Sequence, residues 1–162
     1  MKPTTMPGLI LAAALCLSGA TSALAHDLVS GDLHIIHPSI PDPLPLAKSA
    51  AGYMVISNDG DTPERLLSVR TPFAKVATIH ETVFGDDGVA RMRPVVDLVI
   101  PPNDVLVLEP GGLHVMFMGL TGTADEGDMI PATLIFQNAG EVALEFMVDP
   151  EGGVDHSTMN HD

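Results

Sequence analysis

Two histidines and two methionines in the middle of the chain have the types and the spacing of a metal site: His80, Met92, His114 and Met116. His114 and Met116 are two residues apart in an apolar run, and side chains two apart on a strand project from the same face. His80 and Met92 flank the turn sequence at 85–88, so a hairpin there would bring them close together. We therefore expect all four side chains to converge on one ion.

The ligand types select the metal. Methionine thioether is soft and uncharged, which suits Cu(I) and matches Mg²⁺, Ca²⁺ or Zn²⁺ poorly, while imidazole binds copper in either oxidation state. The chain has one cysteine, Cys16, and it lies in the N-terminal apolar segment. Disulfides, thiolate metal sites and a blue-copper centre, which needs a cysteine ligand, are therefore excluded from the rest of the chain. The sequence predicts a Cu(I) site.

A second group of ligand types stands near the C-terminus. Residues 149–162 are poor in apolar side chains and contain Gly152 and Gly153, so we expect a flexible tail. Within it, His156, Met159 and His161 are candidates for a secondary copper site that could also take Cu(II).

The remaining methionines and two further histidines have less specific settings. Methionine in a strand usually fills gaps in the core, and a single histidine beside an apolar run is usually a hydrogen-bonded structural residue. We expect core positions for Met54, Met118, Met129 and Met147, and structural roles for His34 and His37.

The elements that must position these residues read as strands. Short runs rich in β-branched and apolar residues alternate with Gly, Pro, Asn and Asp clusters, and no window has a helical apolar period. The expected strands are 33–37, 50–58, 65–70, 76–84, 91–95, 105–109, 113–120, 132–138 and 141–148. Residues 38–45 carry four prolines and should form an extended connection instead. The pattern predicts an all-β sandwich or barrel of antiparallel strands.

The N-terminal segment predicts the compartment. Lys2, an apolar run over 9–17 and small residues ending at Ala25 have the layout of a cleavable secretory signal over 1–25. Because no apolar run approaches the length of a spanning helix, we expect a periplasmic protein without a membrane span. A lipoprotein anchored through Cys16 is the alternative, although Leu15 is a poor fit for the small residue expected there.

Charge and length limit the other classes of function. The chain has 7 Lys and Arg against 21 Asp and Glu, a formal net charge of −14. Binding to nucleic acid or to anionic membranes depends on clustered basic residues, so we expect neither. Residues 26–148 are enough for one compact β domain, which we expect to bind the copper.

The ligand spacing resembles that of a known family, the periplasmic copper chaperones called PCuAC. Their signature is a histidine, eleven residues, a methionine, twenty-one residues and then His-x-Met, which His80, Met92, His114 and Met116 match without a gap. The resemblance extends to the stretches 50–58 and 110–116. It implies a cupredoxin-like Greek-key β-barrel or sandwich that binds Cu(I) through these four side chains. It also implies delivery of copper to cytochrome c oxidase, with the oxidase copper subunit or a thioredoxin-like assembly protein as acceptor.

Two other functions stay open at this level. A copper-scavenging or tolerance protein would have the same site and no dedicated acceptor. A copper-dependent oxidative enzyme could use the free amine and imidazole of His26 after signal cleavage, together with His34 or His37. Such an enzyme needs a shaped substrate surface, and the chain has no tryptophan and a single tyrosine, Tyr53. We therefore expect no enzymatic activity.

Overall fold

The computed structural model of the chain describes residues 27–41, 43 and 46–150. This described part contains eleven strands and no helix, so the all-β prediction is confirmed. The strands are β1 (Leu28–Ser30), β2 (Leu33–Pro41), β3 (Ser49–Asn58), β4 (Glu64–Arg70), β5 (Ala74–Phe84), β6 (Ala90–Val95), β7 (Leu98–Ile100), β8 (Asp104–Leu108), β9 (Leu113–Leu120), β10 (Met129–Phe136) and β11 (Glu141–Asp149). No helix that could cross a membrane occurs in these residues.

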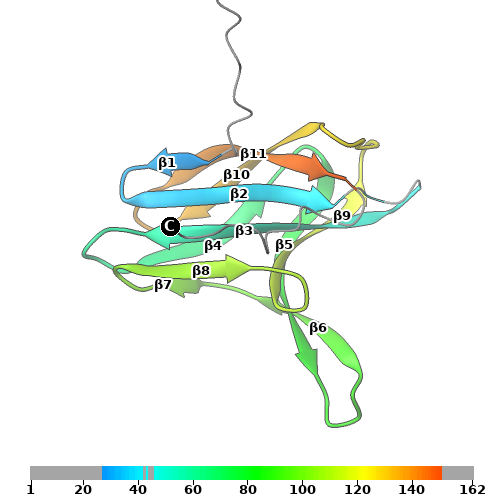
Figure 1. Cartoon of the computed structure of the whole chain (residues 1–162), viewed down its shortest axis with the longest axis horizontal. Helices are drawn as coiled ribbons and strands as arrows, with labels where there is room; N and C mark the ends of the chain where they lie inside the picture. Colours follow the sequence, from blue (N-terminus) through cyan, green and yellow to red (C-terminus); the bar gives the residue numbers. More distant parts are fainter. Residues whose placement is uncertain (1–26, 42, 44–45, 151–162) are drawn as a thin grey trace, which may run out of the picture.

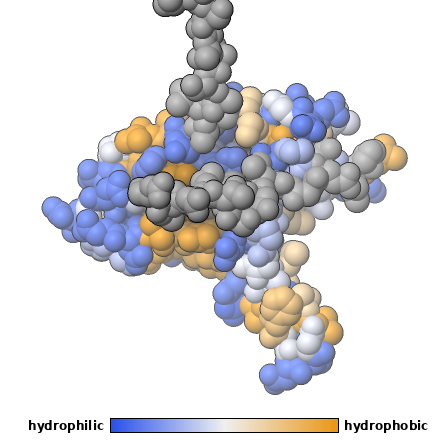
Figure 2. Space-filling view, in the orientation of Figure 1, coloured by the Kyte–Doolittle hydropathy of each residue, from blue (hydrophilic) through white to orange (hydrophobic). Residues whose placement is uncertain are grey.

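The strands form one continuous path of hydrogen-bonded neighbours that folds over on itself (Figure 1). The order is β6-β5-β9-β3-β2-β11-β10-β4-β7, with β1 added to β2 and β8 added to β3. The long strand β3 joins two parts of the sheet, because its residues 49–52 pair with β9 while its residues 54–58 pair with β8. The hairpin of β5 and β6 extends away from the body of the domain (Figure 1 and Figure 2).

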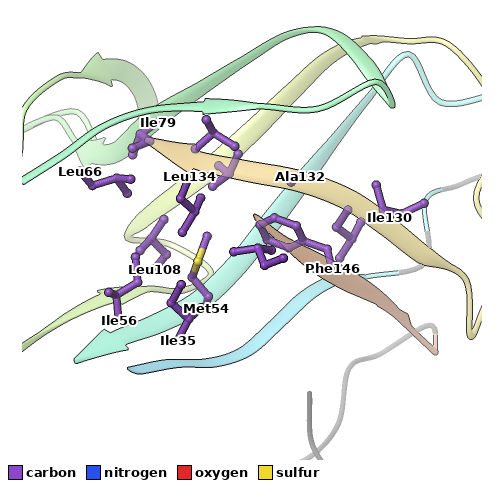
Figure 3. Close-up of a cluster of buried hydrophobic side chains, with 14 of the residues drawn as sticks. Ile35, Met54, Ile56, Leu66, Ile79, Leu108, Ile130, Ala132, Leu134 and Phe146 are labelled. Atoms are coloured by element: carbon purple, nitrogen blue, oxygen red, sulfur yellow. The ribbon is translucent and has the colours of Figure 1, made fainter. Parts of the chain in front are cut away.

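The core lies between the folded halves of the sheet and contains side chains from nearly every strand (Figure 3). Phe117 of β9 is fully buried and meets Phe146 edge to face at a ring distance of 5.4 Å. Gly52 of β3 passes directly over both rings, since a Cβ atom there would lie 2.8 Å from Phe117 Cε2 and 3.0 Å from Phe146 Cε1. This close approach fixes β3 against β9, the strand that contains His114 and Met116.

The prediction for residues 38–45 is wrong over its first half, because β2 continues to Pro41. His37 has a positive φ of 47° and the register with β3 shifts between Ile36 and Ser39. Pro38 therefore lies in an irregularity where no ladder hydrogen bond is required of it. Beyond the shift, β2 pairs in parallel with β11 up to Pro41. The sequence pattern also missed the three-residue strands β1 and β7.

Asn58, at the end of β3, ties the loop after β3 to the end of β7, and its replacement tests this tie. Its amide donates to the carbonyls of Thr62 and Ile100 at 2.8 and 3.1 Å and accepts from the backbone N–H of Gly60 at 3.1 Å, in a side chain only 2% exposed. We expect Asn58→Ala to lower the free energy of unfolding by about 1–3 kcal/mol, because buried backbone groups lose their partners. Denaturant titration measures the effect. The exposed Asn138, whose amide also bonds a carbonyl, is the control, and an equal loss in Asn138→Ala would contradict the explanation.

Candidate metal centre

Three neighbouring strands bring the predicted ligands to one face of the sheet. His80 of β5 lies directly opposite His114 of β9, and Met116 lies opposite Thr78 in the same ladder. Met92 of β6 lies opposite Thr82, two residues along β5 from His80. Because paired residues share a face and alternate residues return to it, the four side chains project from the same side.

The opposite face of β9 and of the part of β5 beside it packs on the core, whereas β6 is exposed on both faces. Ile79, Val115 and Phe117 alternate with the predicted ligands and are at most 4% exposed. The ligand face is therefore specified by the hydrophobic core, since a slip of one residue would exchange the two faces.

The two imidazoles form the centre of the group. Their rings are nearly parallel, at an interplanar angle of 20° and a centroid distance of 6.1 Å. His114 Nδ1 lies 3.2 Å from the carbonyl oxygen of Gly112, and His80 Nδ1 lies 3.3 Å from Thr78 Oγ1. Both Nδ1 atoms are thus engaged, by Thr78 of β5 and by Gly112 just before β9, which leaves the Nε2 atoms for other partners.

His114 Nε2 has the character of a metal ligand. A carbonyl oxygen can only accept, so the contact to Gly112 places the ring proton of His114 on Nδ1 and leaves a lone pair on Nε2. The side chain is 3% exposed, and its Nε2 is buried with no hydrogen-bond partner among the described residues. Buried nitrogen atoms in folded proteins almost always have a partner. A copper ion would supply one here, and the hydrogen bond to the second ring nitrogen is the usual arrangement of metal-bound histidine.

The methionines approach the imidazole pair from opposite ends. Met92 is level with Thr82 and Met116 with Thr78, which separates them by about 13 Å along β5 in ideal strand geometry. Met92 is 61% exposed on the projecting hairpin, whereas Met116 is half-buried. Met92 lies diagonally across from His80, and Met116 is two residues along β9 from His114. That all four bind one ion stays a prediction, and it requires the hairpin to bend toward β9.

The hairpin separates charge from apolar surface. On the side opposite to the predicted ligands, Arg93 donates to Glu81 at 2.6 Å. At the tip, Arg91 donates to Asp87 at 2.6 Å, and this guanidinium lowers the pKa of that carboxyl. The ligand side instead presents uncharged groups, among them Phe84 at 66% exposure. A soft, uncharged surface therefore surrounds Met92.

The other candidate residues lie elsewhere. His34 Nε2 is 3.7 Å from Asp27, and His37 Nε2 is 3.3 Å from the buried carboxylate of Asp149, as structural histidines would be. In the described part of the chain no three His, Cys, Asp or Glu side chains cluster, so the candidate site depends on thioethers. The candidates that fall outside the described residues are Cys16, His26, His156, Met159 and His161.

The core prediction for the remaining methionines is confirmed for Met54 alone, which is 2% exposed. Met118, Met129 and Met147 are half-buried and lie outside the hydrophobic core. Each of their strands has one face on the core and one face toward solvent. Methionine can occupy either face, so the residue type alone does not show which one it is on. Sequence reasoning also missed Thr78 and Gly112, whose only signal is that each precedes a candidate histidine by two residues.

Thr78 is expected to orient His80 toward the metal. Removing an outer-shell partner of a metal ligand typically costs 10- to 100-fold in affinity, so we expect Thr78→Val to weaken Cu(I) binding by about tenfold. Thr78→Ser retains the hydroxyl and should bind as the wild type does. Competition with a chromogenic Cu(I) chelator measures both, and equal affinities of the two variants would contradict this role.

A family model and a curated relative both match this chain. Residues 32–148 match the family model described as "Putative lipoprotein LpqE-like", which covers most of the chain. The chain belongs to the LpqE-like family. A curated relative in Leifsonia xyli subsp. xyli, "Putative lipoprotein Lxx21020", is 28% identical over 88 residues, which are 54% of this chain and 53% of the relative. This LpqE-like chain thus matches the relative over about half of its length.

Solved structures extend the likeness of this LpqE-like chain to PCuAC domains. The copper-bound PCuAC domain from PmoF2 is 26% identical with a TM-score of 0.66, and the alignment covers 77% of this chain and 98% of that domain. The CuI-DR1885 protein of Deinococcus radiodurans is 28% identical with a TM-score of 0.58, over 80% and 85% of the two chains. The resemblance to PCuAC proteins and the cupredoxin-like β fold are therefore confirmed.

Proposed function

We propose that this LpqE-like protein is a periplasmic Cu(I)-binding metallochaperone whose ligands are His80, Met92, His114 and Met116. The observation that carries the proposal is the buried, unpartnered Nε2 of His114, which lies across from His80 on the face that also carries both methionines. Two imidazoles and two thioethers suit Cu(I). The copper-bound structures of PmoF2 and DR1885 support the same assignment.

The exposure of Met92 favours copper delivery over copper scavenging. An ion that must be handed on needs a ligand that an acceptor can reach and replace, and Met92 is 61% exposed on a projecting hairpin. Ligand exchange could therefore begin at this thioether. The proposed acceptor is the copper subunit of cytochrome c oxidase or a thioredoxin-like assembly protein. A scavenger would need no such access.

Catalysis is not part of the proposal. A groove of about 850 Å³, lined by Asp27, Arg70 and Glu145 among others, lies away from the four candidate ligands. An enzyme would need its substrate pocket beside the metal.

The proposed location is outside the cytoplasm. A secretory signal over 1–25 would deliver residues 26–148 as the copper-binding domain and 149–162 as a tail that binds further copper. The lipoprotein names of the family and of the Leifsonia relative also support export, and they favour the alternative of a lipid anchor at Cys16.

Copper-edge X-ray absorption on the purified protein loaded with one Cu(I) tests the binding site. We expect a Cu(I) edge with both nitrogen and sulfur neighbours, and a shell without sulfur would contradict the ligand set. Mixing the loaded protein with the copper-free soluble copper subunit of cytochrome c oxidase tests delivery. Rapid transfer is expected, whereas tight binding without transfer would favour scavenging.

A further inference from the structure

Met118 lies on the same face as the candidate ligands, although nothing in the ligand spacing includes it. It is opposite Val76 of β5 and opposite Ser49 of β3. Val76 is 48% exposed and Ser49 is exposed too, whereas the neighbouring Phe117 is fully buried in the core. The thioether of Met118 therefore belongs to the outer surface of the sheet, where filling the core does not explain it.

The spacing from Met116 to Met118 repeats that from His114 to Met116. Residues two apart on one face of a strand are about 7 Å apart. Met116 and Met118 can therefore reach a shared ion as readily as His114 and Met116 can. On the neighbouring strands, Met116 lies between Thr78 and Ala51. The four cross-strand neighbours of the two methionines are thus uncharged, so the two thioethers are the soft ligands that this position offers.

We propose that Met116 and Met118 form a second position for Cu(I), one step along β9 from the imidazole pair. The inference rests on the proposed function, because Met116 is shared by both positions. An ion moves between them when its bonds to His80, Met92 and His114 break one at a time and a bond to Met118 sulfur forms. The ion stays monovalent throughout, and Met116 holds it during the exchange. A site made of thioethers alone binds more weakly than one that includes imidazole and fills second.

Methyl NMR of the full-length protein with ¹³C-labelled methionine methyl groups tests this directly. Cu(I) is added under reducing conditions, first to one equivalent and then further. We expect the methyl signals of Met92 and Met116 to shift with the first equivalent and that of Met118 with a later one. Met54, in the core, is the internal control and should not move.

Met118→Leu keeps the size and shape of the side chain and removes the sulfur, so the fold should tolerate it. We expect this variant to bind one Cu(I) fewer than the wild type, while Met129→Leu on β10 binds the same number. An unchanged count in Met118→Leu, or a Met118 signal that stays fixed, would overturn the inference. If Met92 and Met116 fail to shift as well, the proposed function fails with it, so the two failures are distinguishable.

Discussion

Replacing His114 by alanine is expected to lower the affinity for Cu(I) by about 100-fold or more. Even the loss of an outer-shell partner of a metal ligand costs 10- to 100-fold, and His114 offers a buried nitrogen that no group in the described part of the chain satisfies. The variant also leaves His80 without the imidazole opposite it in the ladder. Competition with a chromogenic Cu(I) chelator measures the affinity.

The control for this substitution is His34→Ala, on β2. His34 Nε2 lies 3.7 Å from the carboxylate of Asp27, on a strand that carries none of the candidate ligands, and its loss should leave the affinity for Cu(I) unchanged. Because His114 is buried, its replacement can also lower the stability of the fold. Thermal unfolding of the variant is therefore followed both with and without copper. A ligand that binds only the native state raises the melting temperature, and His114→Ala should lose this increment. Affinity equal to that of the wild type would remove His114 from the site.

The largest expected effect on stability belongs to Phe117, which lies between Met116 and Met118 on β9. Its ring is fully buried and meets Phe73 and Phe146 edge to face, at centroid distances of 6.1 and 5.4 Å. We expect Phe117→Ala to lower the free energy of unfolding by about 3–5 kcal/mol through lost burial and a residual cavity. For a domain of this size, the melting temperature should fall by roughly 10–20 °C.

Phe84 provides a matched control for that measurement. It is the same residue type at 66% exposure on the hairpin, so Phe84→Ala should change the free energy of unfolding by about 0.5 kcal/mol or less. Chemical denaturation of both variants without copper gives the comparison. A similar loss in the two would mean that burial between the sheet halves does not govern the stability of this fold.

Much of the candidate site was readable along the chain. The alternation of Val115 and Phe117 with His114 and Met116 identified β9 as a strand with one core face and one ligand face, because the side-chain period of a strand is two residues. The turn at 85–88 predicted the hairpin of β5 and β6 in the same local way. The spacing of the four candidate ligands also indicated the PCuAC resemblance, which the solved structures confirm.

Other features had no local signal. The continuation of β2 through Pro38 to Pro41 depends on a register shift and on parallel pairing with β11, more than 100 residues away in the sequence. The outer position of Met118 could not be separated from a core position, because methionine suits both. Only its partners Val76 and Ser49, from two different strands, decide between them.

The amino-acid sequence by itself determined the class of fold, the soft character of the candidate ligands and the shared face of His114 and Met116, because these follow from residue type and a two-residue period. The tertiary structure decided that His80 stands opposite His114, that both Nδ1 atoms are engaged, and that the Nε2 of His114 is buried without a partner. The physical reason is that register between distant strands is set by packing of the whole core, and no single segment of the chain contains that information.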